Sequence, residues 1–396
     1  MTKHPIPSRE EKLAVWRAYK ERRPTRTPLR WNLNNRAWLL NPSLNTFGWT
    51  YGDYLRDPKV ILETNARFQA WRAEELWPTT CDSSEGLPDE WWCSADVQNC
   101  YDAAFYGGKI FAPPNQVPAV ESFLTLDDVD GFLATDHASE NAIANNPFIM
   151  ERLSLTEELK KAAKDFSFMG RRAKVGEYTF AWGFDGAVTA GAAVFGADFF
   201  LLLAMDPDKG TRLLEKFTRD ALARIRWLNR RAGLPERHKV CGFADDSIQL
   251  LSCDMYRELV LPWHIFYCNE MDESSPAERL RGCHLCGDAT RHFKLISDAV
   301  GVNSFDTGFP VDFAALRREL GPGIEICGGV HVTILQEGTP DSCYAEAARI
   351  LNSGIRDGGR FVLQEANNLP PNVPLENLQA VYQACLEHGR YDKTPA

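Results

Sequence analysis

From residue 177 onward, short β-rich runs alternate with longer segments of helical periodicity, and this order limits the possible folds more than any other feature of the sequence. The β-rich runs cover residues 177–183, 238–246, 280–287, 302–308, 324–330 and 360–366. The helical segments between and after them include residues 209–232, 255–270, 290–299, 313–320, 342–352 and 375–387. Six consecutive β-then-α units predict a parallel sheet with right-handed crossovers.

Six such units make three quarters of a (β/α)8 barrel, and we expect the two missing strands at residues 75–79 and 107–111. A doubly wound open sheet is the alternative, but the chain has neither Gly-x-Gly-x-x-Gly nor a Walker loop. The α/β class with a (β/α)8 TIM barrel is therefore the prediction. A Trp-rich helical and loop extension over residues 1–75 is expected to pack on a barrel formed by residues 76–396.

Charge and apolar patterning exclude several classes of partner. The chain has 44 basic and 54 acidic residues, with no long basic run, so we expect no nucleic-acid binding. Residues 190–205 are apolar but too short to span a bilayer, which predicts a buried core helix and no membrane span. No secretory signal is visible at the start and the 11 cysteines are odd in number, so we expect a cytoplasmic protein with reduced thiols.

Candidate chemistry gathers where the strands end, because a barrel places its functional side chains at the carboxyl ends of its strands. The third run ends in residues 282–288, where His284 and Cys286 are two positions apart and project from the same face. Imidazole and thiolate on one face are two of the ligands that zinc requires. The alternative is that Cys286 only fills space, as buried cysteines often do.

Further ligands have to come from neighbouring strands. Cys327 is the first choice, because alternate strands of a barrel contribute to the same interior layer. Asp306, Glu365 and His331 are further candidates, and Asn367 ranks last because an amide is a poor zinc ligand.

A pair of carboxylates, Asp245 and Asp246, ends the second run. Adjacent carboxylates at a strand end can orient a substrate or take part in acid–base chemistry. Capping of a helix is the competing explanation, and it applies more to Asp245 than to Asp246.

Three stretches together resemble the uroporphyrinogen decarboxylase superfamily, which includes zinc-dependent, corrinoid-linked methyltransferases. Residues 284–288 are similar to the family's His-x-Cys-Gly, residues 327–340 to its Gly-Asn-(Val/Leu)-Asp and Leu-x-x-Gly-Thr-Pro, and residues 374–380 to its Pro-x-Glu-Asn-x-x-Ala. The resemblance extends over residues 29–391. It implies the barrel fold, and it suggests a homodimer.

Departures from the family pattern bear on function. The Arg-Gln-Ala-Gly-Arg and Ser-Asp motifs of true decarboxylases are missing, and residues 30–36 read Arg-Trp-Asn-Leu-Asn-Asn-Arg. The methyltransferases carry a further zinc-binding Cys near the last strand, where this chain has Asn367. Either Cys327 replaces that ligand or the metal is absent.

The function implied is a zinc-dependent methyltransferase that moves a methyl group between a small molecule and a corrinoid protein or a thiol or folate acceptor. In this interpretation His284, Cys286 and Cys327 bind zinc. The candidate catalytic residues are Asp246, Asp306 and Glu365, and the candidate substrate-binding residues are Arg30, Arg36, Asp245, His331 and Asn367. A metal-free decarboxylase or related lyase, with Arg30 and Arg36 gripping carboxylates, and a non-catalytic partner of a corrinoid protein are the alternatives.

Overall fold

Five parallel strands in chain order form the main sheet of the computed structural model, which describes residues 4–179, 184–275 and 278–391. They are β4 (Val240–Ala244), β5 (Leu280–Leu285), β6 (Ser304–Thr307), β7 (Glu325–His331) and β8 (Phe361–Ala366). All five match predicted runs. In register, His284 stands opposite Ala244 on one side and Asp306 on the other, so the inward face of β5 is shared with both neighbours.

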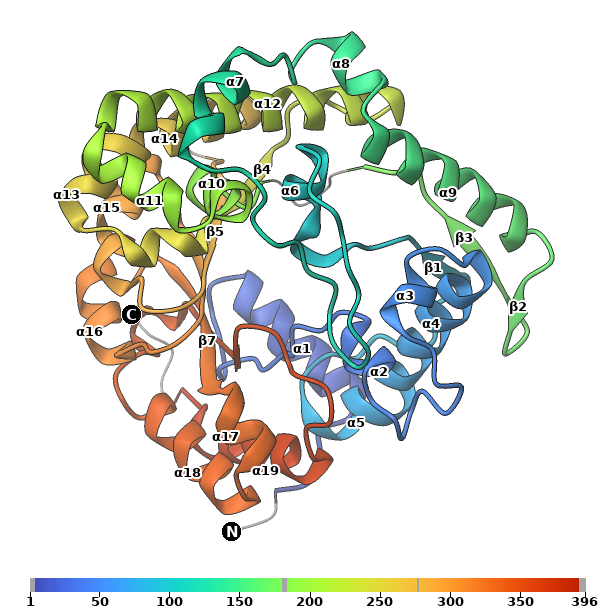
Figure 1. The fold of residues 1–396 in the computed structure, drawn as a ribbon. Helices are drawn as coiled ribbons and strands as arrows, with labels where there is room; N and C mark the ends of the chain where they lie inside the picture. The colour runs from blue at the N-terminus through green and yellow to red at the C-terminus, as the bar shows by residue number, and fades with distance from the viewer. Residues whose placement is uncertain (1–3, 180–183, 276–277, 392–396) are drawn as a thin grey trace.

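Helices cover the outside of this sheet, as Figure 1 shows for the yellow-to-red half of the chain. They are α12 (Pro207–Arg231), α13 (Cys253–Met255), α14 (Leu261–Met271), α15 (Thr290–Val300), α16 (Phe313–Leu320), α17 (Val332–Glu337), α18 (Pro340–Leu351) and α19 (Leu375–His388). The α12 helix buries one apolar face that includes Leu213, Phe217 and Leu228. All six predicted helical segments of this half are confirmed in type.

Short segments continue the sheet at both edges. Leu29 bridges Leu363 of β8 in parallel, and the Asp82 amide donates to the Leu29 carbonyl at 2.8 Å. At the other edge the Ala244 amide of β4 donates to the Phe184 carbonyl at 3.0 Å. These segments extend the sheet toward the predicted (β/α)8 barrel. The barrel wall thus includes residues from the predicted N-terminal extension.

The expected positions of two strands are wrong. Residues 75–79 lie in a π-helical turn, Arg72–Leu76, and in α5 (Trp77–Thr80), while residues 107–111 form no strand beyond a single bridge at Phe111. Local periodicity misled here because strand segments of one to three residues are too short to show a pattern. Of the run 177–183, residues 180–183 lie outside the described residues, and 177–179 belong to no strand.

The N-terminal half combines helices with a small sheet of three strands in the order β1-β3-β2. The strands are β1 (Trp91–Cys93), β2 (Ser167–Phe168) and β3 (Arg171–Val175). The helices are α1 (Arg9–Lys20), α2 (Arg36–Leu39), α3 (Tyr51–Tyr54), α4 (Pro58–Trp71), α6 (Tyr101–Phe105), α7 (Val129–Ala134), α8 (Glu140–Ala144) and α9 (Pro147–Ala163). The α1 and α4 helices lie in the predicted helical and loop extension over residues 1–75.

The predicted core helix over residues 190–205 is two helices, α10 (Ala187–Phe195) and α11 (Ala197–Met205), which meet at 116°. Gly196, with φ +60°, stands at the bend, where a left-handed backbone favours glycine. Within the described residues, no single helix has the length and apolarity to cross a membrane, and this bent pair alone passes that test.

The α1 helix packs against the amino-terminal halves of β7 and β8. Its Tyr19 hydroxyl donates to Glu325 at 2.7 Å, and its ring packs with Cys327 and Val362. A capping box between Ser8 and Glu11 starts the helix. The α1 helix therefore covers the amino-terminal ends of these two strands.

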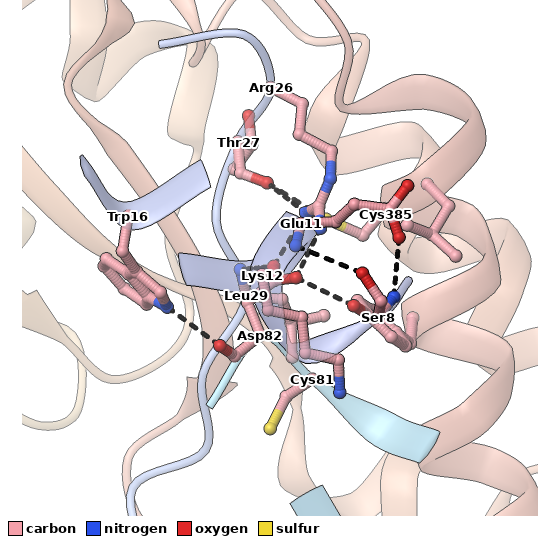
Figure 2. Close-up of polar contacts among 12 residues, drawn as sticks. Ser8, Glu11, Lys12, Trp16, Arg26, Thr27, Leu29, Cys81, Asp82 and Cys385 are labelled. Atoms are coloured by element: carbon pink, nitrogen blue, oxygen red, sulfur yellow. Dashed lines mark hydrogen bonds and ion pairs between the residues drawn. The ribbon is translucent and has the colours of Figure 1, made fainter. Parts of the chain in front are cut away.

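Beside α1 lies a buried ion pair that we call the Arg26–Asp82 cluster, formed by Arg26, Asp82 and Tyr382. Figure 2 shows Arg26 and Asp82 of this cluster. Both Asp82 oxygens accept from the Arg26 guanidinium. Asp82 also accepts from the Leu29 amide at 2.8 Å and from the Tyr382 hydroxyl at 2.7 Å. The cluster ties the N-terminal segment to α19.

Candidate metal site at the carboxyl ends of the strands

Asp246, His284 and Cys286 converge where β4 and β5 end. One ligand atom from each lies within 4.8 Å of the other two, and this is the only such trio of His, Cys, Asp or Glu among the residues that the structure describes. His284 is the fifth residue of β5, Cys286 follows the strand, and Asp246 comes two residues after β4. Parallel register brings these positions side by side, and Asp246 accepts from the Cys286 amide at 2.7 Å.

Hydrogen bonds orient the His284 ring. Its Nδ1 lies 2.9 Å from Asp306 Oδ2 on β6, and its Nε2 lies 3.0 Å from Cys286 Sγ. Asp306 accepts on its other oxygen from Gln364 Nε2 of β8. Because the Asp306 carboxylate only accepts, Nδ1 carries a proton, and Nε2 faces Cys286 Sγ.

Electrostatics at the site favour a charged imidazole–thiol pair. Burial alone would lower the pKa of His284, but hydrogen bonds to Asp306 and Cys286 raise it well above its ordinary value. Burial raises the pKa of the Cys286 thiol, an effect that His284 opposes. Binding of a metal ion at this position would displace the proton shared by Nε2 and Sγ.

The donor set fits zinc. Zinc accepts carboxylate oxygen, imidazole nitrogen and thiolate, at bond lengths of about 2.0–2.3 Å, and two such bonds span at most about 4.6 Å. A carboxylate behind the distal nitrogen of a histidine ligand is the usual second partner in zinc sites, and Asp306 occupies that position. The residues present would hold the ion with three ligands and leave a position open.

Cys327 does not belong to this group, which corrects its expected place as third ligand. It packs with Tyr19 and Val362, only 2% exposed, and burial raises its pKa. The expectation took Cys327 for the end of its strand, but β7 continues for four more residues to His331. The side chain therefore lies in the lower barrel, and Asp246, predicted as a catalytic residue, lies beside His284 and Cys286 instead.

Asp245 caps a helix. Its carboxylate accepts from the Val188 and Thr189 amides at the start of α10 and from the Thr189 hydroxyl, and it lies 3.0 Å from His264 Nε2. It is fully buried, and these partners engage both of its oxygens. Asp245 thus caps α10 rather than the helical turn that follows it, to which its side chain provides no cap.

Three other predicted residues lie around the trio. Arg30 Nε donates to Gln364 Oε1 at 3.1 Å, and Gln364 in turn donates to Asp306, so Gln364 links Arg30 to Asp306. Glu365 is fully buried, accepts from the Asn32 amide at 3.2 Å, and has a pKa that burial raises well above its ordinary value. The Arg36 guanidinium lies within electrostatic reach of Cys286 and Glu365, and no described residue forms an ion pair with it.

His331 and Asn367 have local roles in the backbone. His331 Nδ1 accepts from the Thr333 amide at the start of α17, and its ring lies 3.6 Å from that of Phe309. Asn367 follows β8 with φ 86°, a left-handed conformation that asparagine tolerates. Neither belongs to the trio of Asp246, His284 and Cys286.

Sequence reasoning missed Asp185, Gln364 and Asn32. Burial and the charge of Asp102 raise the pKa of Asp185 to about 7, and Asp246 and His284 lie within its electrostatic reach. Asn32 Nδ2 donates to Asp306 at 3.4 Å. The position of Asp185 after the edge segment that pairs with β4 could have identified it, whereas Gln364 and Asn32 carry no sequence signal.

The fold and the trio define a class of protein: a barrel with a candidate metal site at the carboxyl ends of its strands. The model of the family uroporphyrinogen decarboxylase (URO-D) matches residues 103–388. The chain belongs to this family.

Two curated relatives come from Methanosarcina mazei. Methylated-thiol–coenzyme M methyltransferase is 31% identical over 150 residues, 37% of this chain and 37% of that protein. Methylcobamide:CoM methyltransferase MtbA is 25% identical over 145 residues, 37% of this chain and 40% of that protein. The matched region thus spans well under half the length of these relatives.

A solved structure described as a methyltransferase from Methanosarcina mazei matches with a TM-score of 0.61 and 18% identity, over 96% of this chain and 98% of that one. At this identity the match concerns the fold, and it confirms the barrel.

Proposed function

We propose that this protein is a zinc-dependent methyltransferase that moves a methyl group between a small molecule and a corrinoid carried by a partner protein, or a thiol acceptor. The single observation that carries the proposal is the trio of Asp246, His284 and Cys286 with Asp306 behind the imidazole. Two methyltransferases among the relatives support the same reaction class.

Asp246, His284 and Cys286 would hold the ion, whose chemistry is to hold a bound thiol as thiolate, or to polarise a heteroatom, at the open position. Asp306 keeps a proton on His284 Nδ1, so Nε2 stays available as a ligand atom. Gln364 in turn holds Asp306 in place.

Arg36 supplies positive charge. Its guanidinium, within electrostatic reach of Cys286, would stabilise the negative charge of a thiolate at the site. During transfer, the bond from the methyl carbon to the donor atom breaks as the bond to the acceptor atom forms. The donor atom keeps the electron pair of the broken bond.

Zinc analysis of the purified protein tests the proposal. We expect about one equivalent of zinc in the parent and less than about a tenth in Cys286→Ala. Cys253→Ala is the matched control, because Cys253 is also partly exposed but bonds only to the Arg291 carbonyl at 3.7 Å. A parent protein that binds no added zinc, or a Cys286→Ala variant that keeps it, would refute the proposal.

Activity separates the reaction classes. A parent that is active after chelation and releases carbon dioxide from a carboxylic acid would establish the decarboxylase alternative instead. Methyl transfer that stops in chelator and returns with zinc would support the proposed reaction.

A further inference from the structure

A cavity of about 520 Å³ is lined by residues of the N-terminal half of the chain. Its wall comes from the segment before α2, from α3, α4, α6 and α9, and from the segments around β1 and β3. Because the metal-site proposal does not use this cavity, its chemistry is an independent source of information.

Aromatic and amide side chains dominate the lining. The aromatic members are Tyr54, Phe68, Trp92, Tyr101 and Tyr178, and the amide members are Asn34, Asn35, Asn65 and Gln98. None of the lining residues within the described part of the chain is Lys, Arg or His. Such a wall is unsuited to a sulfonate, phosphate or carboxylate, which proteins bind through basic groups.

Two carboxylates complete the lining. Glu177 lies at the edge, where Lys160 pairs with it at 2.5 Å. Asp96 accepts from the Gln98 amide at 2.8 Å and from the Gln98 side chain. Burial raises the pKa of Asp96, an effect that these hydrogen bonds and the charge of Arg36 oppose, while no described Lys or Arg forms an ion pair with it. The Asp96 carboxylate therefore has lone pairs left for a cation.

The Tyr178 hydroxyl is a further polar group of the wall. It is buried, and it has no hydrogen-bond partner among the residues that the structure describes. Buried hydroxyls without partners are rare in proteins and call for an explanation such as a bound molecule. Because Tyr178 lines the cavity, a ligand there would supply the missing contact.

The cavity is connected to the candidate metal site through Tyr101. Tyr101 lines the cavity and shares a hydrogen bond with Asp185, and Asp246 and His284 lie within electrostatic reach of Asp185. Asp185 therefore links the cavity wall to the trio.

We propose that this cavity binds the cationic end of the small-molecule substrate, an organic ammonium group held by aromatic faces and by Asp96. The inference rests on the proposed function for the reacting end of the molecule, and it adds the class of substrate. Aromatic faces attract ammonium groups through the negative charge of their π-systems, and a desolvated site strengthens that attraction.

Tetramethylammonium is the probe, measured by isothermal titration calorimetry, with neopentyl alcohol as the uncharged analogue of similar shape and 3-mercaptopropionate as an anionic thiol. We expect saturable binding of tetramethylammonium, and binding of neopentyl alcohol at least about tenfold weaker. Asp96→Asn should weaken tetramethylammonium binding at least about tenfold. Asp127→Asn, a change of an exposed carboxylate far from the lining, should not.

Trp92→Ala serves as the second variant, because Trp92 is 53% exposed and its removal leaves the core intact. It should also weaken binding. Equal binding of the charged and uncharged probes, undiminished binding in both variants, or no binding of tetramethylammonium would overturn the proposal. Binding of tetramethylammonium should persist in Cys286→Ala. Failure of the zinc analysis would therefore refute the proposed function alone, and failure of the titration would refute the cavity proposal alone.

Discussion

The Arg26–Asp82 cluster and the candidate metal site both consist of charged side chains, but they differ in exposure and in how fully their polar atoms are bonded. The Arg26 and Asp82 side chains are 8% and 0% exposed, and Asp82 accepts from three partners. The His284 and Asp306 side chains are 28% and 30% exposed. At the site, His284 Nε2 and Cys286 Sγ face one another, and both are atom types that can bind a metal ion.

This difference separates structural from chemical use of charge. A buried pair with every lone pair occupied has nothing left to offer a ligand, and its value lies in holding two chain segments together. A half-exposed group with free ligand atoms is less useful to stability and open to chemistry. If the two regions are independent, a change in the Arg26–Asp82 cluster should alter stability and leave zinc binding unchanged.

Arg26→Met should have the largest effect, because it leaves the Asp82 charge buried without its partner. We expect the free energy of unfolding to fall by about 3–5 kcal/mol, measured by urea denaturation. The folded variant should bind as much zinc as the parent. Arg23→Met, which breaks the exposed pair with Glu21, is the control and should change stability by less than about 1 kcal/mol. Loss of zinc in Arg26→Met would show that the two regions are coupled.

Asp306→Asn should weaken zinc binding by about 10- to 100-fold without removing a ligand, because Asp306 orients His284. Competition with a chromophoric chelator measures this change. Asp298→Asn, which alters an exposed carboxylate paired with Lys294, should leave the zinc affinity unchanged. An unchanged affinity in Asp306→Asn would mean that Asp306 does not support the histidine ligand.

Acid should weaken the scaffold through His292, which is buried and lies 3.0 Å from the Ile248 carbonyl. Burial lowers the pKa of His292 to about 4, below its ordinary 6.5, so the unfolded chain binds more protons between these values. The stabilisation is complete above pH 6.5 and is lost as the pH falls toward 4. The contribution is about 1 kcal/mol per pH unit, and urea denaturation at pH 7, 6 and 5 should show a shallower dependence in His292→Gln. An equally steep dependence in the variant would contradict this assignment.

Cys327→Ala should have the smallest effect on the site, with zinc content equal to that of the parent, because Cys327 packs against Tyr19 in the lower barrel. Its removal should lower the free energy of unfolding by about 1 kcal/mol through lost packing. Zinc loss comparable to that of Cys286→Ala would restore Cys327 as a ligand.

Sequence patterns predicted most of the barrel, because β4 to β8 are long enough to show a period and each is followed by a helix. The same reasoning failed for the short edge segments at Leu29 and Phe184, whose pairing depends on distant strands. At the site, the spacing of His284 and Cys286 on one strand was sufficient to bring them together. Asp246 lies where Cys327 was expected, because register and strand length decide which side chain reaches the trio, and neither can be read locally.

The pairing of the N-terminal segment with the last strand has a consequence for how the chain acquires its structure. Leu29 bridges Leu363, Thr27 donates to the Gly389 carbonyl, and Tyr391 donates to Thr25, so contacts join positions more than 330 residues apart. During synthesis, residues near 29 emerge long before their partners and must wait until β8 and α19 are made. Contacts of such long range slow folding and delay closure of the barrel to the last step. We expect nascent chains stopped before residue 361 to remain open along this edge and to rely on chaperones.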